Sequence, residues 1–136
     1  MSKPKAIIPH NALVVVADGG KAILLRNTGA SGELTLHEEQ RLTLQDFSND
    51  GPSGSRPQEQ TPHQTDEATF AKKLAHALFT MHEQKRYERL VLIADPQTLG
   101  QLRTAMHKTV EASLVETLSK DYTNMRTAEI QKALSH

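Results

Sequence analysis

The feature that most constrains the fold is a run of five apolar residues, 90–94, which is followed directly by Asp95 and Pro96. A continuous apolar run of this length that ends at a turn signal is typical of a strand buried on both faces of a sheet. Asp95 is expected to cap a following helix, and Pro96 suits the first helical position because no N–H is needed there. The segment therefore predicts an α/β fold with a covered central sheet.

Three more strands are predicted in the first third of the chain. Residues 13–17 and 21–26 are apolar runs separated by Asp18 and two glycines, a pattern that predicts a β-hairpin. From residue 33 to 44, apolar and polar residues roughly alternate, which predicts a third, half-exposed strand.

Helical periodicity follows on both sides of the buried strand. We predict one helix from Thr65, as its N-cap, to about residue 86, and a second helix over 96–106. The inner face of the first helix would carry Phe70, Leu74, Ala77, Leu78 and Met81, and that of the second Leu99, Leu102 and Met106.

The last quarter of the chain is predicted to add a fifth strand and a helix. Residues 110–118 are rich in β-forming residues, with a bulge or a slightly different strand boundary expected because the alternation slips at Leu114 and Val115. A final helix is predicted to open at Asp121. The order of elements implies a single α/β domain over residues 1–136, with a mixed sheet of about five strands, antiparallel at one side and parallel at the other.

The apolar pattern disappears between residues 46 and 65. This segment contains three prolines and two glycines, with no apolar position other than proline between Phe47 and Ala68. We predict a long flexible loop. Two interpretations stay open: loops of this length are often functional, but a passive insertion costs little closure entropy.

Composition and motifs exclude several classes of function. Lys and Arg balance Asp and Glu at 16 each, so overall charge predicts neither DNA nor membrane binding. There is no cysteine, no pair of the 7 histidines at metal-binding helical spacing, and no phosphate-binding glycine loop. We therefore expect no metal, no cofactor and no catalytic residue. Asp18 and Asp95 stand at strand ends, where turn and cap roles explain them better than a two-carboxylate nuclease does.

The N-terminus has too short an apolar run for a signal peptide, and no segment reaches transmembrane length, so we expect a cytoplasmic bacterial protein. Basic residues gather around the first predicted helix. They could contact RNA phosphates, although a solvated helix face interspersed with acidic residues explains them as well. Tyr87 is the exposed aromatic candidate for stacking beside them. The basic residues are Lys72, Lys73, Lys85, Arg86 and Arg89.

Four segments together resemble a bacterial family. They are residues 14–24, with Ala-Asp-Gly-Gly-Lys, 70–78, 87–103, with Ile-Ala-Asp-Pro, and 120–123. The family is the host attachment protein family, associated with attachment to host cells and similar to the middle domain of archaeal and eukaryotic class-one peptide release factors. The resemblance implies a mixed sheet with helices on both faces, similar to ribonuclease-H-like components of the translation machinery.

In release factors the loop before the first long helix carries Gly-Gly-Gln, which acts in the peptidyl-transferase centre. The corresponding residues 46–65 contain no Gly-Gly-Gln, so we expect no peptide release by that mechanism. The resemblance implies a non-catalytic ribosome- or RNA-associated protein, with Arg56 and Gln58 of the loop and the five basic residues making contact. The alternative is a host-attachment-related protein that acts through protein partners without touching nucleic acid.

Overall fold

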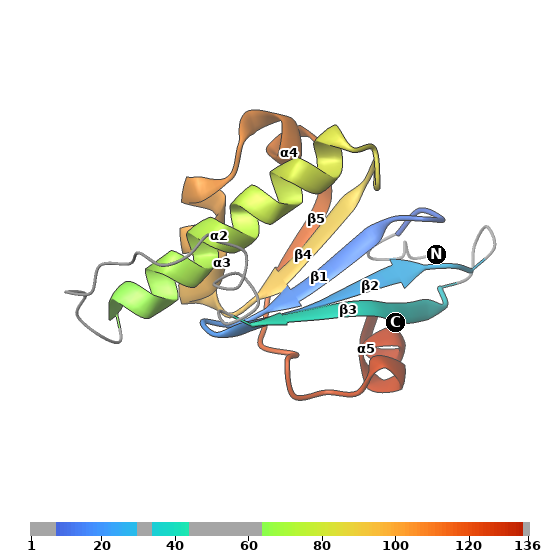
Figure 1. Ribbon diagram of the computed structural model, residues 1–136. Coiled ribbons are helices and arrows are strands. Elements are labelled where there is room, and N and C mark those ends of the chain that lie inside the picture. Colours follow the sequence, from blue (N-terminus) through green and yellow to red (C-terminus); the bar gives the residue numbers. More distant parts are fainter. Residues whose placement is uncertain (1–7, 30–33, 44–63, 135–136) are drawn as a thin grey trace.

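A mixed five-stranded sheet forms the centre of the protein (Figure 1). The computed structural model describes residues 8–29, 34–43 and 64–134, with side chains from residue 69 onward in the long helix. The predicted loop over residues 46–65 therefore lies almost wholly outside the described residues. The strands are β1 (Leu13–Ala17), β2 (Lys21–Asn27), β3 (Leu36–Thr43), β4 (Leu90–Ala94) and β5 (Leu114–Ser119), and the helices are α2 (Gln64–Glu83), α3 (Pro96–Ala105), α4 (Lys108–Ala112) and α5 (Thr127–Leu134).

The strands lie in the order β3-β2-β1-β4-β5, so the first strand of the chain is the middle strand of the sheet. β1 pairs antiparallel with β2 and parallel with β4, and β5 pairs parallel with β4. β2 pairs antiparallel with β3. The prediction of a hairpin at one side and parallel strands at the other is confirmed.

The two faces of the sheet carry separate cores, because successive strand residues point to opposite sides. In β1, Leu13, Val15 and Ala17 pack with residues of α2, α3 and α4, whereas Val14 and Val16 pack with residues of α5. Figure 1 shows the same division, with α2, α3 and α4 on one side of the sheet and α5 on the other. Every residue of β1 and β4 is buried, as the apolar runs predict.

A bulge in β3 lets this edge strand serve both cores. Leu36 and Leu42 are an even number of residues apart and would lie on one face of a regular strand. The pairing shifts where Leu24 faces Gln40 and Leu25 faces Glu38, so the residue between those two partners is extra. Leu36 consequently joins the α5 core and Leu42 joins the α2 core.

A second bulge confirms the one predicted at Leu114 and Val115. Leu90 faces Leu114 and the next residue, Val91, faces Glu116, so Val115 is the extra residue and is exposed. Leu114 packs against the α2 core, whereas Leu118 packs against the α5 core.

Several predicted boundaries are wrong. Residues 110–112 belong to α4 rather than to the strand predicted over 110–118, and β5 begins only at Leu114. The last helix begins at Thr127 instead of Asp121. The long helix begins at Gln64, one residue before its predicted cap, and ends at Glu83, and β3 begins at Leu36. Over the described part of the chain, no helix combines the length and apolarity that crossing a membrane requires.

Candidate functional site

The structure divides the five predicted basic residues between two places. Lys72 and Lys73 lie on α2, whereas Lys85, Arg86 and Arg89 lie between the end of α2 and β4. All five side chains are exposed. We call these five the basic set. The other two predicted contacts, Arg56 and Gln58, lie outside the described residues.

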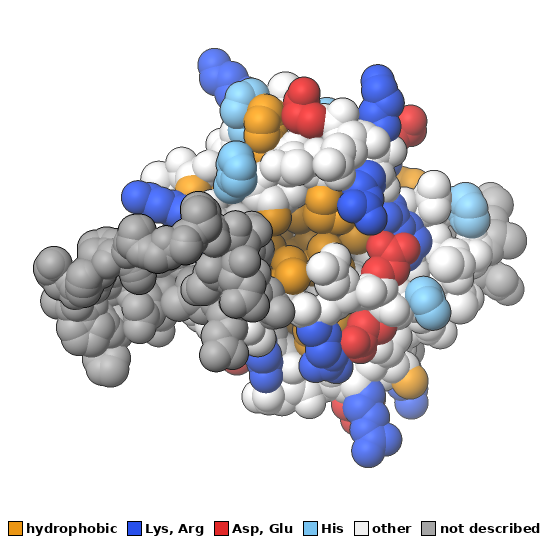
Figure 2. Space-filling model, viewed as in Figure 1, with side chains coloured by type: hydrophobic (Ala, Val, Ile, Leu, Met, Phe, Trp, Pro, Cys, Tyr) orange, Lys and Arg blue, Asp and Glu red, His pale blue; other side chains and the backbone are white. Residues whose placement is uncertain are grey.

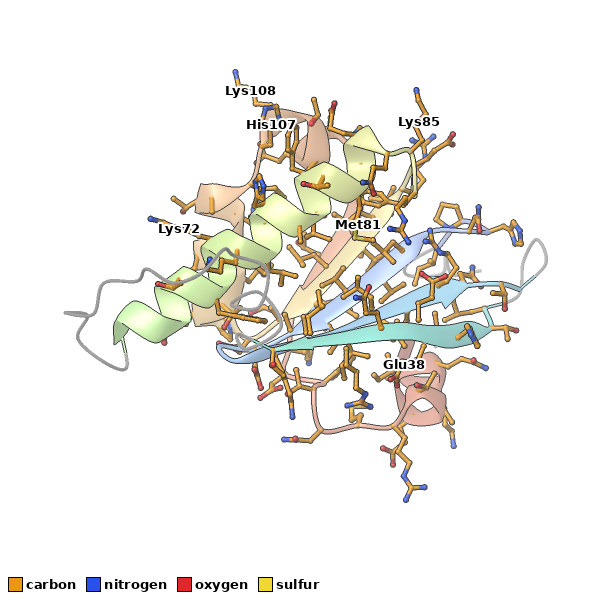
Figure 3. The ribbon with its side chains drawn as sticks, in the orientation of Figure 1. Glu38, Lys72, Met81, Lys85, His107 and Lys108 are labelled. Atoms are coloured by element: carbon orange, nitrogen blue, oxygen red, sulfur yellow. The ribbon has the colours of Figure 1, made fainter. Side chains whose placement is uncertain are left out.

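The inner face of α2 positions this set. Phe70, Leu74 and Leu78 are fully buried and recur at helical spacing, so they fix the rotation of the helix on the sheet. That rotation leaves Lys72 and Lys73 in solvent. In Figure 3 the labelled Lys72 lies at the outer side of α2, away from the sheet.

The end of α2 places the next two basic residues in different directions. Lys85 donates its N–H to the carbonyl oxygen of His82, and Arg86 donates to that of Met81, both at 2.9 Å. Lys85 has φ of 60°, so these bonds form a Schellman motif with lysine at the left-handed position that favours glycine. The motif brings the backbone of Arg86 back to Met81, whereas the Lys85 side chain points away from the body (Figure 3).

A groove of about 710 Å³ runs between α2 and β3, and we call it the α2–β3 groove. Leu42 of β3 and Ala77 and Met81 of α2 contribute its apolar surface. Figure 2 shows this hollow near the centre of the view, with hydrophobic side chains at the bottom and both Lys or Arg and Asp or Glu side chains around it. Its lining cations are Lys72, Lys73 and Arg86, and no carboxylate lines it among the residues whose side chains the structure describes.

The groove thus unites three of the basic set and leaves Lys85 and Arg89 outside. Helical periodicity placed Ala77 and Met81 on the buried helix face, but both are only half-buried and line the groove. One feature of the sequence distinguishes Ala77 and Met81 from the fully buried residues of α2. They lie beside the fully buried line of Phe70, Leu74 and Leu78 instead of on it, although only the position of β3 shows that the space next to them is open.

No member of the basic set is neutralised by a described carboxylate. The salt bridges within the described residues join Arg26 to Glu39 at 3.1 Å and Arg41 to Glu38 at 2.7 Å, and none involves the basic set. The Glu38 pKa is lowered by its hydrogen bond to Arg41. The carboxylates of β3 are therefore already paired, and the groove cations keep their charge available for a ligand.

Tyr87 does not stand on the surface, which corrects the prediction of an exposed stacking ring. Its side chain is 4% exposed, and its hydroxyl donates a hydrogen bond of 2.8 Å to the carbonyl oxygen of Leu78. Burial raises the pKa of Tyr87 to about 12, against a smaller opposing effect of a hydrogen bond with Ser113. The chain reversal after α2 brings this ring back against the helix, so Tyr87 holds the turn together and offers no face to a base.

The turn and cap roles predicted for Asp18 and Asp95 are confirmed. Asp18 accepts hydrogen bonds from the N–H groups of Gly20 and Lys21 at 2.8 and 2.9 Å. Asp95 accepts one from the N–H of Thr98 at 3.2 Å and so caps α3. These carboxylates are occupied by the backbone, as the hairpin and helix cap require.

A second polar cluster joins the hairpin turn to the segment after β5. The Thr123 hydroxyl lies 2.6 Å from an Asp121 oxygen and 3.1 Å from an Asp18 oxygen, so one proton serves two carboxylates. Hydrogen bonds from the Thr123 hydroxyl and N–H, together with the charge of Lys21, lower the pKa of Asp121. Among the described residues, no three His, Asp or Glu side chains are grouped to hold a metal ion.

Comparison with known protein families identifies a release-factor-like family. The family described as bacterial archaeo-eukaryotic release factor family 12 matches residues 11–134. This finding confirms the release-factor part of the resemblance and gives no support to the host-attachment name. A comparison with curated proteins finds no match.

Proposed function

Because the chain belongs to the bacterial archaeo-eukaryotic release factor family, we propose that it is a cytoplasmic ribosome- or RNA-associated protein that does not catalyse peptide release. The family match over residues 11–134 is the observation that carries this proposal. The sequence has no Gly-Gly-Gln, the tripeptide that acts in the release factors it resembles. The proposed role is therefore contact with ribosomal RNA rather than hydrolysis.

The basic set supports the RNA contact. Its five side chains are exposed and unpaired with described carboxylates, so each can release a counterion when it meets a phosphate. The turn after α2 brings Arg86 back beside Met81, which lies nine residues after Lys72, or ~14 Å along α2. Phosphates along a single RNA strand or across a groove can meet cations at such separations. Arg56 and Gln58 remain predicted contacts.

Sedimentation with ribosomes tests the proposal. The tagged full chain would be followed through sucrose gradients from growing and stationary cells, at low and at high salt. We expect part of it to migrate with ribosomes at low salt and to dissociate at high salt, because phosphate contacts are salt-sensitive. A protein that stays at the top of every gradient would contradict the proposal.

Two variants locate the contact. Replacing all five members of the basic set by glutamine should abolish comigration, and deletion of residues 51–60 should weaken it if the predicted loop takes part. The matched control replaces Arg126 and Lys132, two exposed cations at the α5 side of the sheet, and should comigrate like the wild type. Equal loss in the control would assign the effect to total charge instead of to this surface.

A further inference from the structure

The α2–β3 groove has a chemistry that RNA contact alone does not use. Leu42, Ala77 and Met81 give it an apolar surface, and none of the lining residues that the structure describes is Phe, Tyr or Trp. Surfaces that bind single-stranded nucleic acid stack bases on such rings, and Tyr87 is buried. An occupant that covers this groove therefore needs apolar side chains of its own.

The positive charge at the border of the groove indicates which charge an occupant should carry. Lys72 and Lys73 lie along the first half of the groove and Arg86 lies at its other end, and the described lining residues include no carboxylate. Since none of the three pairs with a described carboxylate, each is available to an incoming acidic group. The groove thus complements a ligand that is apolar along its middle and negative beside it.

The edge of the sheet argues against an added strand. β3 carries a bulge, which interrupts a regular ladder, and its exposed middle is rich in charged residues. The N–H of Leu36 is already bonded to the side-chain oxygen of Gln131 at 2.8 Å. An occupant is therefore expected to lie along α2 instead of extending the sheet from β3.

We infer that the α2–β3 groove docks an acidic amphipathic helix of a partner protein. Apolar side chains of that helix would pack on Leu42, Ala77 and Met81, and its carboxylates would pair with the groove cations, a helix-in-groove mode of recognition. The lining extends from Thr69 of α2 to Gln84, the residue after the end of this helix, or ~22 Å at ~1.5 Å per residue, which suits a helix of about 15 residues. This inference goes beyond the proposed ribosome contact.

Designed peptides that carry the inferred chemistry can stand in for the partner helix. The probe is a fluorescent peptide of about 15 residues with leucine at helical spacing and glutamate elsewhere. One control peptide replaces the glutamates by lysine, and another replaces the leucines by serine. We expect the full-length protein to bind the first peptide at least roughly tenfold more tightly than either control, since both charge and apolar contact contribute.

Variants of the groove show where the peptide binds. Met81→Glu removes an apolar contact and adds a like charge, and Thr80→Glu adds the charge at an exposed position that is not part of the core. Each should weaken the acidic peptide by roughly tenfold. Lys132→Glu on α5 is the matched control and should leave the affinity unchanged. A urea melt of each variant separates lost binding from lost folding, and Thr80→Glu should fold normally.

Each result of these binding measurements either supports or overturns the inference. Tight binding of the acidic peptide that Thr80→Glu weakens and Lys132→Glu leaves intact supports the inference. Equal affinity for the lysine and glutamate peptides, or no loss in Thr80→Glu, overturns it. An oligouridine RNA that binds instead, and is lost in Thr80→Glu, makes the groove a nucleic-acid site and also overturns it. Lys85 and Arg89 lie outside the groove, so ribosome binding that depends on them stands or falls separately.

Discussion

Replacing Tyr87 by phenylalanine removes one hydroxyl from the interior and keeps the buried ring. That hydroxyl donates to the Leu78 carbonyl at 2.8 Å from a side chain that is 4% exposed. A buried hydrogen bond of this kind contributes about 1 kcal/mol net to folding. We therefore expect Tyr87→Phe to lower the free energy of unfolding by about 1 kcal/mol at pH 7.

The difference in free energy of unfolding between the wild type and Tyr87→Phe should vanish at alkaline pH. Burial raises the pKa of Tyr87 from 10.0 to about 12, so the folded protein resists an ionisation that the unfolded chain undergoes. The stability linked to this group is present below the unfolded pKa and is lost as the pH rises through the folded pKa. At about pH 11 linkage gives a loss of up to about 1.4 kcal/mol, which solvent screening reduces to about 1 kcal/mol. The wild type would then equal the phenylalanine variant.

Urea unfolding followed by circular dichroism at both pH values measures this difference. Lysines also titrate in alkali, but they do so in both proteins and cancel in the comparison. Tyr122, the other tyrosine, is half-buried, and Tyr122→Phe controls for the loss of any phenolic group. Equal stability of wild type and Tyr87→Phe at pH 7, or a difference that persists unchanged at about pH 11, would refute the reasoning.

Three further substitutions test local features of the fold. Lys85→Gly should raise the free energy of unfolding by about 0.5 kcal/mol in urea melts, because glycine relieves the left-handed backbone there at some cost in unfolded-state entropy, and a destabilised variant would contradict the Schellman motif. Asp95→Ala should lower the same quantity by about 1 kcal/mol through loss of the cap on Thr98, and an unchanged melt would mean that the cap contributes nothing. Thr123→Val should return the pKa of Asp121 toward 3.8, as NMR titration can follow. Because a lowered carboxyl pKa gives stability above the unfolded pKa that is lost as pH falls, this variant should lose less stability than the wild type between about pH 5 and 2, and a steeper loss would be inconsistent with the assigned hydrogen bonds.

The central strands could be predicted because each is an unbroken run of apolar residues, which indicates burial directly from the sequence. β1 and β4 are five-residue apolar runs, and Asp18 and Asp95 end them with side chains that bond to backbone N–H groups within three residues. Interactions of such short range need no knowledge of the rest of the fold. The bulge at Val115 was also predictable, since it shows as a break in alternation.

The wrong predictions depend on contacts that are distant or on segments too short to show a period. α4 has five residues and buries only Val110, so its apolar residues alternate as in a strand. Asp121 was predicted to open the last helix, but its side chain accepts hydrogen bonds from Thr123 in a turn and α5 begins only at Thr127. Tyr87 lies among charged residues in the sequence and is buried only because the turn after α2 returns it to Leu78.

The candidate site could also be predicted only in part, because the groove depends on segments that are distant in the sequence. Exposed Lys72 and Lys73 follow from the periodicity of α2, whereas the groove needs β3, which lies more than twenty residues earlier in the chain. The sequence therefore predicted the charged residues and could not predict which of them share an apolar groove. Lys85 and Arg86 are neighbours in sequence, yet only Arg86 lines it.

The salt dependence of ribosome binding tests the central claim most directly. Affinity of the purified protein for purified ribosomes would be measured over a range of salt concentrations, for the wild type and for Lys85→Gln with Arg89→Gln. We predict that the logarithm of the affinity falls linearly with the logarithm of salt concentration, and that the slope becomes shallower by about 0.7–0.9 for each phosphate that the double variant leaves without its cation. No binding at low salt would contradict the proposed ribosome association, and a slope unchanged in the double variant would contradict the assignment of Lys85 and Arg89 to RNA contact.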